Sequence, residues 1–235
     1  ALPISLSRLV RASGMDREHR LARAAAEQNR KFEFFSPLEC VQADAMHAIR
    51  VPDEKGKRRK AYLLAFIDDA TRRIVYARFS FTEHSGTFEA RIKHILKAHG
   101  RIGKLYADNG SSFVAQQTMR ILSVLGIILV HSRPYKPQGR GKIERFFRTV
   151  REQFMSTLDG EGITSIEVLN VRFHQWLETE YHRTPHRGLK GATPLEVWLE
   201  KARYIIPMDP GIDLDEIFRH EQTRKVYKDS TITLD

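Results

Sequence analysis

The stretch AYLLAFIDDA, residues 61–70, is a near-continuous apolar run that ends in two acidic residues. A short apolar run of this kind is typical of a strand buried on both faces of a sheet. The preceding segment 39–49 alternates in polarity, and the following segment 72–81 is β-branched and aromatic, so both are predicted to be strands. The charged segment 52–60 is predicted to be the turn between the first two strands. These three strands are expected to form an antiparallel meander.

After this meander the hydrophobic period becomes helical. Apolar residues recur at helical spacing from Phe88 to Leu96, and Gly100 stands where a helix C-cap belongs. The remaining predicted elements of the core are, in order, a strand at 103–107, a helix over 114–125, a strand at 127–130 and a helix over 143–154. A meander followed by alternating helices and strands predicts an α/β fold with a mixed five-stranded sheet flanked by helices.

The chain is predicted to have four parts. They are an N-terminal helical connector (1–37), an α/β core (38–160), a C-terminal helical extension of the core (161–210) and the start of a β domain (211–235). Residues 224–234 read as strand, turn and strand without a partner sheet, and the chain opens with Ala1. We therefore expect an excised fragment of a longer protein.

The charge balance favours a polyanionic partner. The 235 residues include 39 basic and 29 acidic side chains, a formal net charge of +10. Such an excess indicates nucleic acid first, although a merely solvated basic surface gives the same count. No run of 18 apolar residues is present, so no membrane span is predicted. The single Cys40 cannot form an internal disulfide, which fits a reducing compartment such as the cytoplasm.

Three acidic residues stand where carboxylates are unusual. Asp44 lies inside the first predicted strand, where an unpaired carboxylate is costly and needs a partner or a metal ion. Asp108 directly follows a later strand, and is either a turn former or a ligand. Glu144 follows Asp108 after 35 intervening residues and lies on a basic helix, where salt bridges to Arg140 and Arg148 are the alternative explanation.

These three acids could converge at one edge of the sheet. Three carboxylates are hard oxygen donors of the kind that Mg²⁺ or Mn²⁺ prefers. Two such ions about 3.5–4 Å apart can activate a nucleophile and stabilise the leaving oxygen at one phosphorus. Asp68 and Asp69 compete for this role, but they begin a turn and are expected to bind backbone amides or Arg72 and Arg73.

Three segments carry a resemblance to a known family. They are QADA (42–45), YADNGSSF (106–113) and PYKPQGRGKIERFFRTV (134–150). Their order and spacing resemble the DDE transposase and retroviral integrase family, closest in look to bacterial insertion-sequence and phage Mu-like transposases. The resemblance implies a ribonuclease H-like core over 38–160. It also implies that 211–235 is a truncated β-hairpin or the start of a small β-barrel.

The same resemblance implies an activity. Asp44, Asp108 and Glu144 would be the catalytic and metal-binding residues, with two Mg²⁺ or Mn²⁺ ions when DNA is bound. The protein would be a DDE-type polynucleotidyl transferase that cuts the 3′ ends of a DNA element and joins them to target DNA. It would act as a homo-oligomer on DNA in the bacterial cytoplasm, associated with the nucleoid. The rival interpretations are a nuclease of this fold without strand transfer and a non-catalytic DNA-binding protein.

A basic loop and helix surround the predicted acid Glu144. The residues expected to contact DNA are Arg133, Tyr135, Lys136, Gln138, Arg140, Lys142, Arg145 and Arg148. The aromatic and amide side chains are expected at bases or sugars, and the cations at phosphates. An ordinary solvated basic loop is the alternative.

Overall fold

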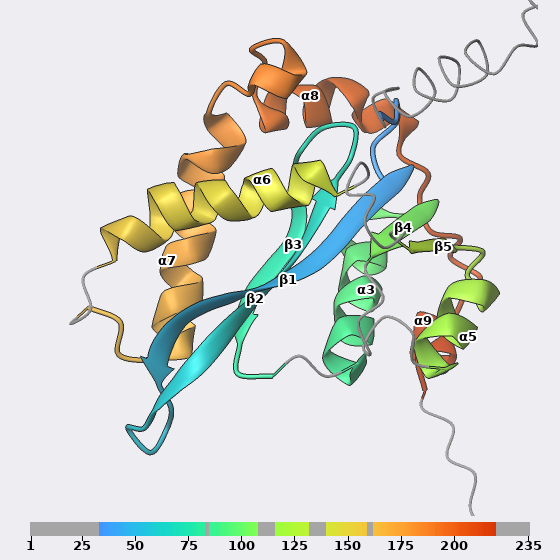
Figure 1. Cartoon of the computed structure of the whole chain (residues 1–235). Coiled ribbons are helices and arrows are strands. Elements are labelled where there is room, and N and C mark those ends of the chain that lie inside the picture. The colour runs from blue at the N-terminus through green and yellow to red at the C-terminus, as the bar shows by residue number, and fades with distance from the viewer. Residues whose placement is uncertain (1–32, 83–84, 108–115, 132–139, 159–161, 220–235) are drawn as a thin grey trace, which may run out of the picture. The chain divides into compact units, whose positions relative to one another are not determined.

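A computed structural model describes residues 33–82, 85–107, 116–131, 140–158 and 162–219 (Figure 1). The described residues from Phe34 onward belong to one compact unit. Within them, a five-stranded sheet has helices on both faces, so the predicted α/β fold is confirmed.

The sheet is mixed, as predicted. Its strands are β1 (Cys40–Pro52), β2 (Arg58–Asp68), β3 (Ile74–Ser80), β4 (Lys104–Ala107) and β5 (Ile128–His131). The order across the sheet is β3-β2-β1-β4-β5, with β1, β2 and β3 antiparallel and β1, β4 and β5 parallel. The turn predicted at 52–60 is shorter than expected, because Arg58–Lys60 pair with Arg50–Pro52 in an exposed extension of the hairpin.

The helices follow the predicted order with adjusted ends. They are α3 (Ser85–His99), α5 (Gln116–Val124), α6 (Gly141–Thr149), α7 (Ile166–Thr179), α8 (Pro194–Lys201) and α9 (Leu214–Ile217). A π-helical turn, Val150–Phe154, continues α6, and 3₁₀ turns occupy Met155–Thr157, Tyr181–Arg183, Arg187–Leu189 and Ala202–Tyr204. None of the helices in the described part of the chain has the length and apolar composition needed to cross a bilayer.

Gly100 ends α3 where the sequence predicts a cap. Its φ of +112° is a conformation that L side chains rarely adopt. A Cβ at this position would also lie 2.6 Å from the carbonyl oxygen of Ile206. Both the helix end and the close approach of the later segment therefore require glycine.

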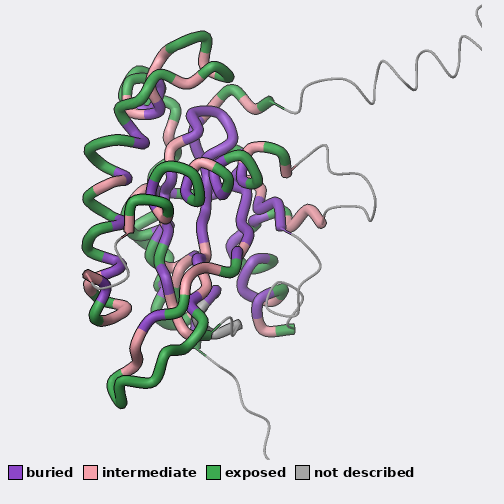
Figure 2. The backbone as a smooth tube through the Cα atoms, turned by 60° about the vertical axis from the view of Figure 1, so that its left-hand side comes forward, coloured by how far each residue is buried: buried purple, intermediate pink, exposed green. Residues whose placement is uncertain are grey.

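Two hydrophobic clusters cover the two faces of the sheet. Val41 and Ala43 of β1 pack with α3 and α5, whereas Met46 packs with α6 and α7. Because side chains alternate along a strand, Gln42 and Asp44 project to the same face as Met46. Figure 2 shows the resulting run of buried residues along the central strands. The α6 face is thus the one that receives the polar side chains of β1.

The helix α7 protects the edge strand β3. Asn170 accepts a hydrogen bond from the backbone N–H of Phe79 at 2.8 Å and donates one to its carbonyl at 3.0 Å. The Nε2 atom of His182, just beyond α7, accepts from the N–H of Ile74 at 3.1 Å. Burial lowers the pKa of His182 to about 4, so its ring is neutral and can act as this acceptor. These contacts occupy part of the outward-facing backbone of the edge strand β3.

The end of the described chain packs on the core. Leu214 and Phe218 belong to the cluster around α3 and α5, and each is less than a tenth exposed. The apolar side chains of Leu214 and Phe218 thus contact the core, and the division of the chain at 211 stays a prediction. Residues 220–235, with the predicted hairpin, and 1–32 of the predicted connector lie outside the described residues.

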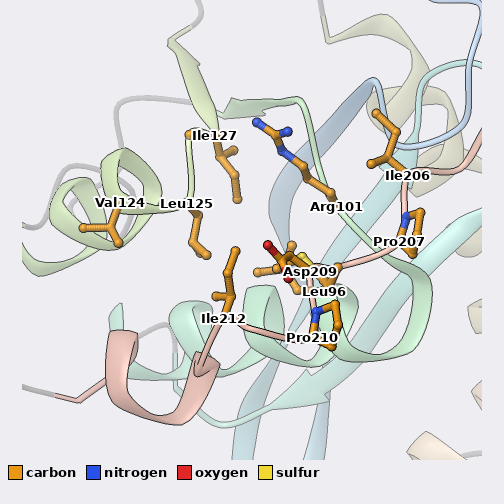
Figure 3. Close-up of a pocket in the computed structure, with 12 residues that line it drawn as sticks. Leu96, Arg101, Val124, Leu125, Ile127, Ile206, Pro207, Asp209, Pro210 and Ile212 are labelled. Atoms are coloured by element: carbon orange, nitrogen blue, oxygen red, sulfur yellow. The ribbon is translucent and has the colours of Figure 1, made fainter.

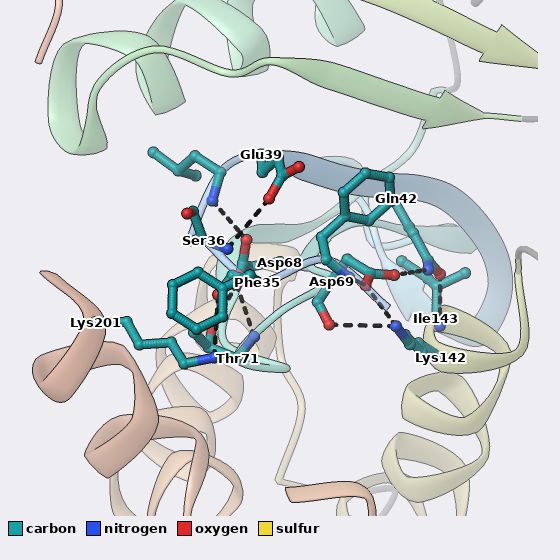
Figure 4. Close-up of polar contacts among 12 residues, drawn as sticks. Phe35, Ser36, Glu39, Gln42, Asp68, Asp69, Thr71, Lys142, Ile143 and Lys201 are labelled. Carbon is teal, nitrogen blue, oxygen red and sulfur yellow. Dashed lines mark hydrogen bonds and ion pairs between the residues drawn. The ribbon is translucent and has the colours of Figure 1, made fainter. Parts of the chain in front are cut away.

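Asp68 anchors the turn between β2 and β3. Its carboxylate, which is fully buried, accepts hydrogen bonds from Leu38 N at 2.7 Å, Thr71 N at 2.8 Å and Thr71 Oγ1 at 2.6 Å (Figure 4). Burial raises the pKa of Asp68 to about 6, although these hydrogen bonds oppose the shift. The expectation that Asp68 binds backbone amides is confirmed, and the contact ties the segment before β1 to the turn.

Replacing Asp68 with alanine should destabilise the fold strongly. The substitution leaves three buried donors on Leu38 and Thr71 without an acceptor. At about 1–3 kcal/mol for each unsatisfied group, we expect a loss of about 3–5 kcal/mol in the free energy of unfolding. Urea denaturation measures this loss, and Glu54→Ala in the exposed hairpin turn, expected within about 0.5 kcal/mol of wild type, is the control. A loss for Asp68→Ala as small as that of the control would contradict the assigned role.

Candidate active site

Asp44 lies inside β1, with only a tenth of its side chain exposed. Its Oδ1 atom accepts a hydrogen bond from the N–H of Ala45 at 2.9 Å, and its Oδ2 atom accepts one from Nη2 of Arg140 at 2.5 Å. No Lys or Arg is adjacent to Asp44 in β1, and the cationic partner is the residue that precedes α6. The buried carboxylate therefore holds a cationic group.

Asp108 lies outside the described residues, but the strand that leads to it is described. In the parallel pair of β1 and β4, Gln42 lies opposite Tyr106. Along the sequence, Asp44 is two residues beyond Gln42, and Asp108 is two residues beyond Tyr106. The described register of the two strands thus leads toward both acids in the same direction.

Glu144 lies in the first turn of α6 and is exposed. Its backbone N–H donates to the carbonyl of Arg140 at 3.1 Å, whereas its carboxylate has no ion pair within the part of the chain that the structure describes. The alternative explanation, a salt bridge from Glu144 to Arg140 or Arg148, is not seen there. The guanidinium of Arg140 lies against Asp44 instead.

A buried polar network joins the start of α6 to the sheet (Figure 4). Gln42 accepts a hydrogen bond from the N–H of Ile143 at 3.3 Å, and its own amide group donates to Asp69 at 2.8 Å. Lys142 donates to the same carboxylate at 2.5 Å. The first N–H groups of a helix lack partners within the helix, and the N-cap residue Arg140 makes no side-chain cap here. Gln42 therefore provides part of the missing cap from a different element.

This network, formed by Gln42, Asp69, Lys142 and the N–H of Ile143, lies next to Asp44 and Glu144, the two described members of the predicted set of acids. Gln42 is two residues before Asp44 on the same face of β1, and Ile143 is the residue before Glu144. The apolar stripe of α6 packs beneath it, with Ile143, Phe146 and Phe147 each less than 5% exposed. The hydrogen bonds of the network and the packing of this apolar stripe together hold α6 on β1.

The structure changes the predicted role of one cation. Lys142, expected at a DNA phosphate, directs its ammonium group to the buried carboxylate of Asp69. Asp69 was expected to bind amides or an arginine of its own turn; it does accept from the N–H of Phe34 at 3.0 Å, but its cationic partner is Lys142. Both assignments differ because residues 73 positions apart meet only in the folded chain.

The remaining predicted DNA contacts divide into two sets. Arg145 and Arg148 are exposed on α6, in agreement with contact to a ligand. The loop residues Arg133, Tyr135, Lys136 and Gln138 lie outside the described residues. Gln42 is not among the site residues predicted from the sequence. Its place on the same face of a predicted strand as Asp44 could have indicated a role in the site.

The available donors suit a hard divalent cation. Within the described ranges, no group of three or more His, Cys, Asp or Glu side chains could hold a metal ion. Asp44 and Glu144 are described and Asp108 is not, so the predicted set of three has no complete geometry. The two described members are carboxylates, the donor type that Mg²⁺ prefers, and Asp44 already binds a cationic group.

A cavity of about 540 Å³ opens on the other face of the sheet (Figure 3). It lies between α3, α5 and the segment that precedes α9, and its lining is mainly apolar, as at Leu96, Ile127 and Ile212. Leu96 and Ile127 belong to the cluster on the α3 and α5 face, whereas Asp44 projects to the α6 face. The cavity is therefore separate from the candidate active site.

Replacing only Lys142 of the buried Lys142–Asp69 ion pair should lower the free energy of unfolding more than replacing both residues. Lys142→Met leaves the fully buried carboxylate of Asp69 without its cation, and we expect a loss of about 3–5 kcal/mol in the free energy of unfolding. Adding Asp69→Asn removes the stranded charge and should restore much of this loss. Lys93→Met, which breaks an exposed ion pair with Asp215, is the matched control and should change stability little. Additive losses in the double variant, measured by urea denaturation, would contradict the pairing.

The chain matches a known family of sequences. Two sequence models described as the integrase core domain match the chain, one over residues 36–137 and the other over residues 125–194. The chain is similar to the transposase of transposon Tn552 from Staphylococcus aureus, with 27% identity over 82% of this chain and 44% of that protein. It is also similar to the putative transposase y4bF of Sinorhizobium fredii, with 30% identity over 61% of this chain and 34% of that protein. The chain thus spans less than half the length of these relatives.

Solved structures show the same fold. The HTLV-2 integrase catalytic core domain, in complex with magnesium and in a dimeric form, superposes with a TM-score of 0.54. The match covers 72% of this chain and 99% of that one, at 16% sequence identity. At this identity the likeness concerns the fold, and it extends over nearly the whole of the solved domain.

Proposed function

Since this chain belongs to the integrase core domain family of transposases and retroviral integrases, we propose that it is the catalytic core of a DNA transposase. The reaction would be metal-dependent cleavage at the 3′ ends of a DNA element, followed by transfer of those ends to target DNA. The observation that carries the proposal is Asp44, a carboxylate in a central strand that is held by a cation and faces the helix of Glu144.

The proposed metal ligands are Asp44, Asp108 and Glu144. Mg²⁺ or Mn²⁺, as two ions when DNA is bound, would activate the attacking oxygen and stabilise the leaving oxygen at the same phosphorus. The donor chemistry of Asp44 and Glu144 supports this choice, as does the magnesium complex of the HTLV-2 domain with its similar fold. No side chain is needed as a covalent nucleophile.

The protein's own residues hold the two described carboxylates in place. Gln42 and Asp69 tie the start of α6 to β1, so the backbones that carry Asp44 and Glu144 keep a constant spacing. Burial of Asp44 reduces the screening of its charge by water, which strengthens its attraction for a cation. Catalytic geometry of this kind depends on rigid secondary structure around the ligands.

DNA would reach the site over the exposed face of α6. Arg145 and Arg148 are exposed there, and the chain carries a net charge of +10, which favours a phosphate backbone. The partners would be the ends of the element and the target DNA. We also propose a homo-oligomer on DNA, in keeping with the dimeric form of the HTLV-2 domain.

Removing any one of the three acids should abolish catalysis. For Asp44→Ala, Asp108→Ala and Glu144→Ala, loss of a metal ligand should lower both cleavage and strand transfer by about three orders of magnitude or more. Glu152→Ala removes an exposed acid of the π-helical turn that continues α6, and should keep activity. The assay uses the element's own ends, supplied uncut for cleavage and pre-cut for joining, with Mg²⁺.

The assay separates the proposal from its rivals. DNA binding, measured by fluorescence anisotropy, should persist in the three inactive variants, because the acids do not contact phosphates without a metal. Cleavage without joining would indicate a simple nuclease of this fold. Metal-dependent strand transfer retained by Asp44→Ala or Glu144→Ala would exclude that residue as a catalytic ligand.

The two exposed arginines of α6 should contribute to binding through counterion release. Arg145→Ala and Arg148→Ala should each weaken DNA binding for all sequences and reduce the slope of log affinity against log salt by about 1. Lys57→Ala removes the same charge from the exposed tip of the β1–β2 hairpin and should leave the slope unchanged. Equal slopes for all three variants would show that α6 does not meet the phosphate backbone.

A further inference from the structure

We propose that Arg140 is an internal counter-ion of Asp44, which it must release before a divalent cation can bind to that carboxylate. The inference rests on the proposed function, because it takes Asp44 as a metal ligand. It gives Arg140 a second role besides the phosphate contact predicted from the sequence: it sets how readily the candidate site accepts its metal.

The geometry of the contact carries the inference. Nη2 of Arg140 lies 2.5 Å from Oδ2 of Asp44, with the two side chains 23% and 10% exposed. The other oxygen of Asp44 accepts from the N–H of Ala45. Both oxygens of the carboxylate thus have a donor, and the donor to Oδ2 is the positively charged guanidinium of Arg140. Hydrogen bonds between two charged groups are stronger than neutral ones, and partial burial limits the screening of this pair.

A divalent cation bound at this carboxylate oxygen would lie close to the guanidinium of Arg140, and the two positive charges would repel each other. Two like charges within a few ångströms repel strongly where water is partly excluded. Metal binding at Oδ2 would therefore require the guanidinium to move away. The apparent affinity for metal is lowered by the free energy of the Arg140–Asp44 contact, because that contact has to be broken first.

The backbone allows Arg140 to move without disturbing the helix. Arg140 is the N-cap residue, and its carbonyl accepts the N–H of Glu144 at 3.1 Å. The start of α6 is held separately by Gln42, which accepts from the N–H of Ile143. A rotation of the Arg140 side chain therefore leaves the predicted ligand Glu144 where it is. The released guanidinium would lie beside the exposed arginines of α6, on the face proposed for DNA.

The experiment measures Mn²⁺ binding to the whole chain by isothermal titration calorimetry, without DNA. Arg140→Gln should bind Mn²⁺ about tenfold more tightly than the wild type, because a charged hydrogen bond no longer has to be broken. Arg151→Gln removes the same charge from an exposed residue of the π-helical turn that continues α6, and should bind Mn²⁺ much as the wild type does. Asp44→Asn tests whether the carboxylate of Asp44 is a metal ligand, and it should weaken the binding of Mn²⁺.

Each outcome separates the inference from the proposed function. If Arg140→Gln binds no more tightly than Arg151→Gln while Asp44→Asn still loses affinity, the counter-ion role is wrong and Asp44 remains a metal ligand. If Asp44→Asn binds Mn²⁺ as well as the wild type, Asp44 is not a ligand, and the inference falls with that part of the proposed function.

A metal-free thermal unfolding cycle provides a second readout. Arg140→Gln and Asp44→Asn should each change the Tm, and the double variant should show strong non-additivity, because the two side chains form one pair. Additive changes in Tm would show that the contact does not exist in solution and would overturn the inference. This cycle also reports whether each variant is folded before metal binding is compared.

Discussion

The buried side chain of Gln42 connects the two elements on which the candidate site depends. A helix that begins after a loop has N–H groups without partners, and α6 begins at Gly141 with an N-cap arginine whose side chain is used elsewhere. Gln42 accepts one of those N–H groups and donates in turn to Asp69, which binds Lys142 from the same helix turn. A strand and a helix are thereby joined at the point where each carries a predicted catalytic acid.

Asp44, Asp68 and Asp69 are stabilised in different ways. Asp68 accepts only from neutral donors of its own turn and of the segment before β1. Asp69 is neutralised by Lys142, and Asp44 by Arg140. Burial makes an unpaired carboxylate expensive, so each of these arrangements is a condition for folding. Lys142 belongs to the network that joins α6 to β1, whereas Arg140, which contacts Asp44, is the N-cap residue of α6.

The sequence predicted most of the fold because its signals are local. The apolar run 61–70, the switch to helical spacing after residue 81 and the glycine at 100 each depend on a few neighbouring residues, and the strands and helices occur where these patterns place them. Contacts between distant parts of the chain do not follow from such local patterns. The segment after 211 packs on the core because Leu214 and Phe218 find the cluster around α3 and α5. Lys142 faces the sheet because Asp69 lies beneath it.

The sequence by itself determined the α/β class, the strand order of the meander, the three candidate acids and the family resemblance, because spacing and residue type carry that information. The tertiary structure alone decided how charges are paired around those acids. Gln42, Asp69 and Lys142 come from three separate elements, and the partner of Asp44 is 96 residues away along the chain. Such contacts depend on the order and register of strands and on the packing of a helix across them, which no local pattern of residues encodes.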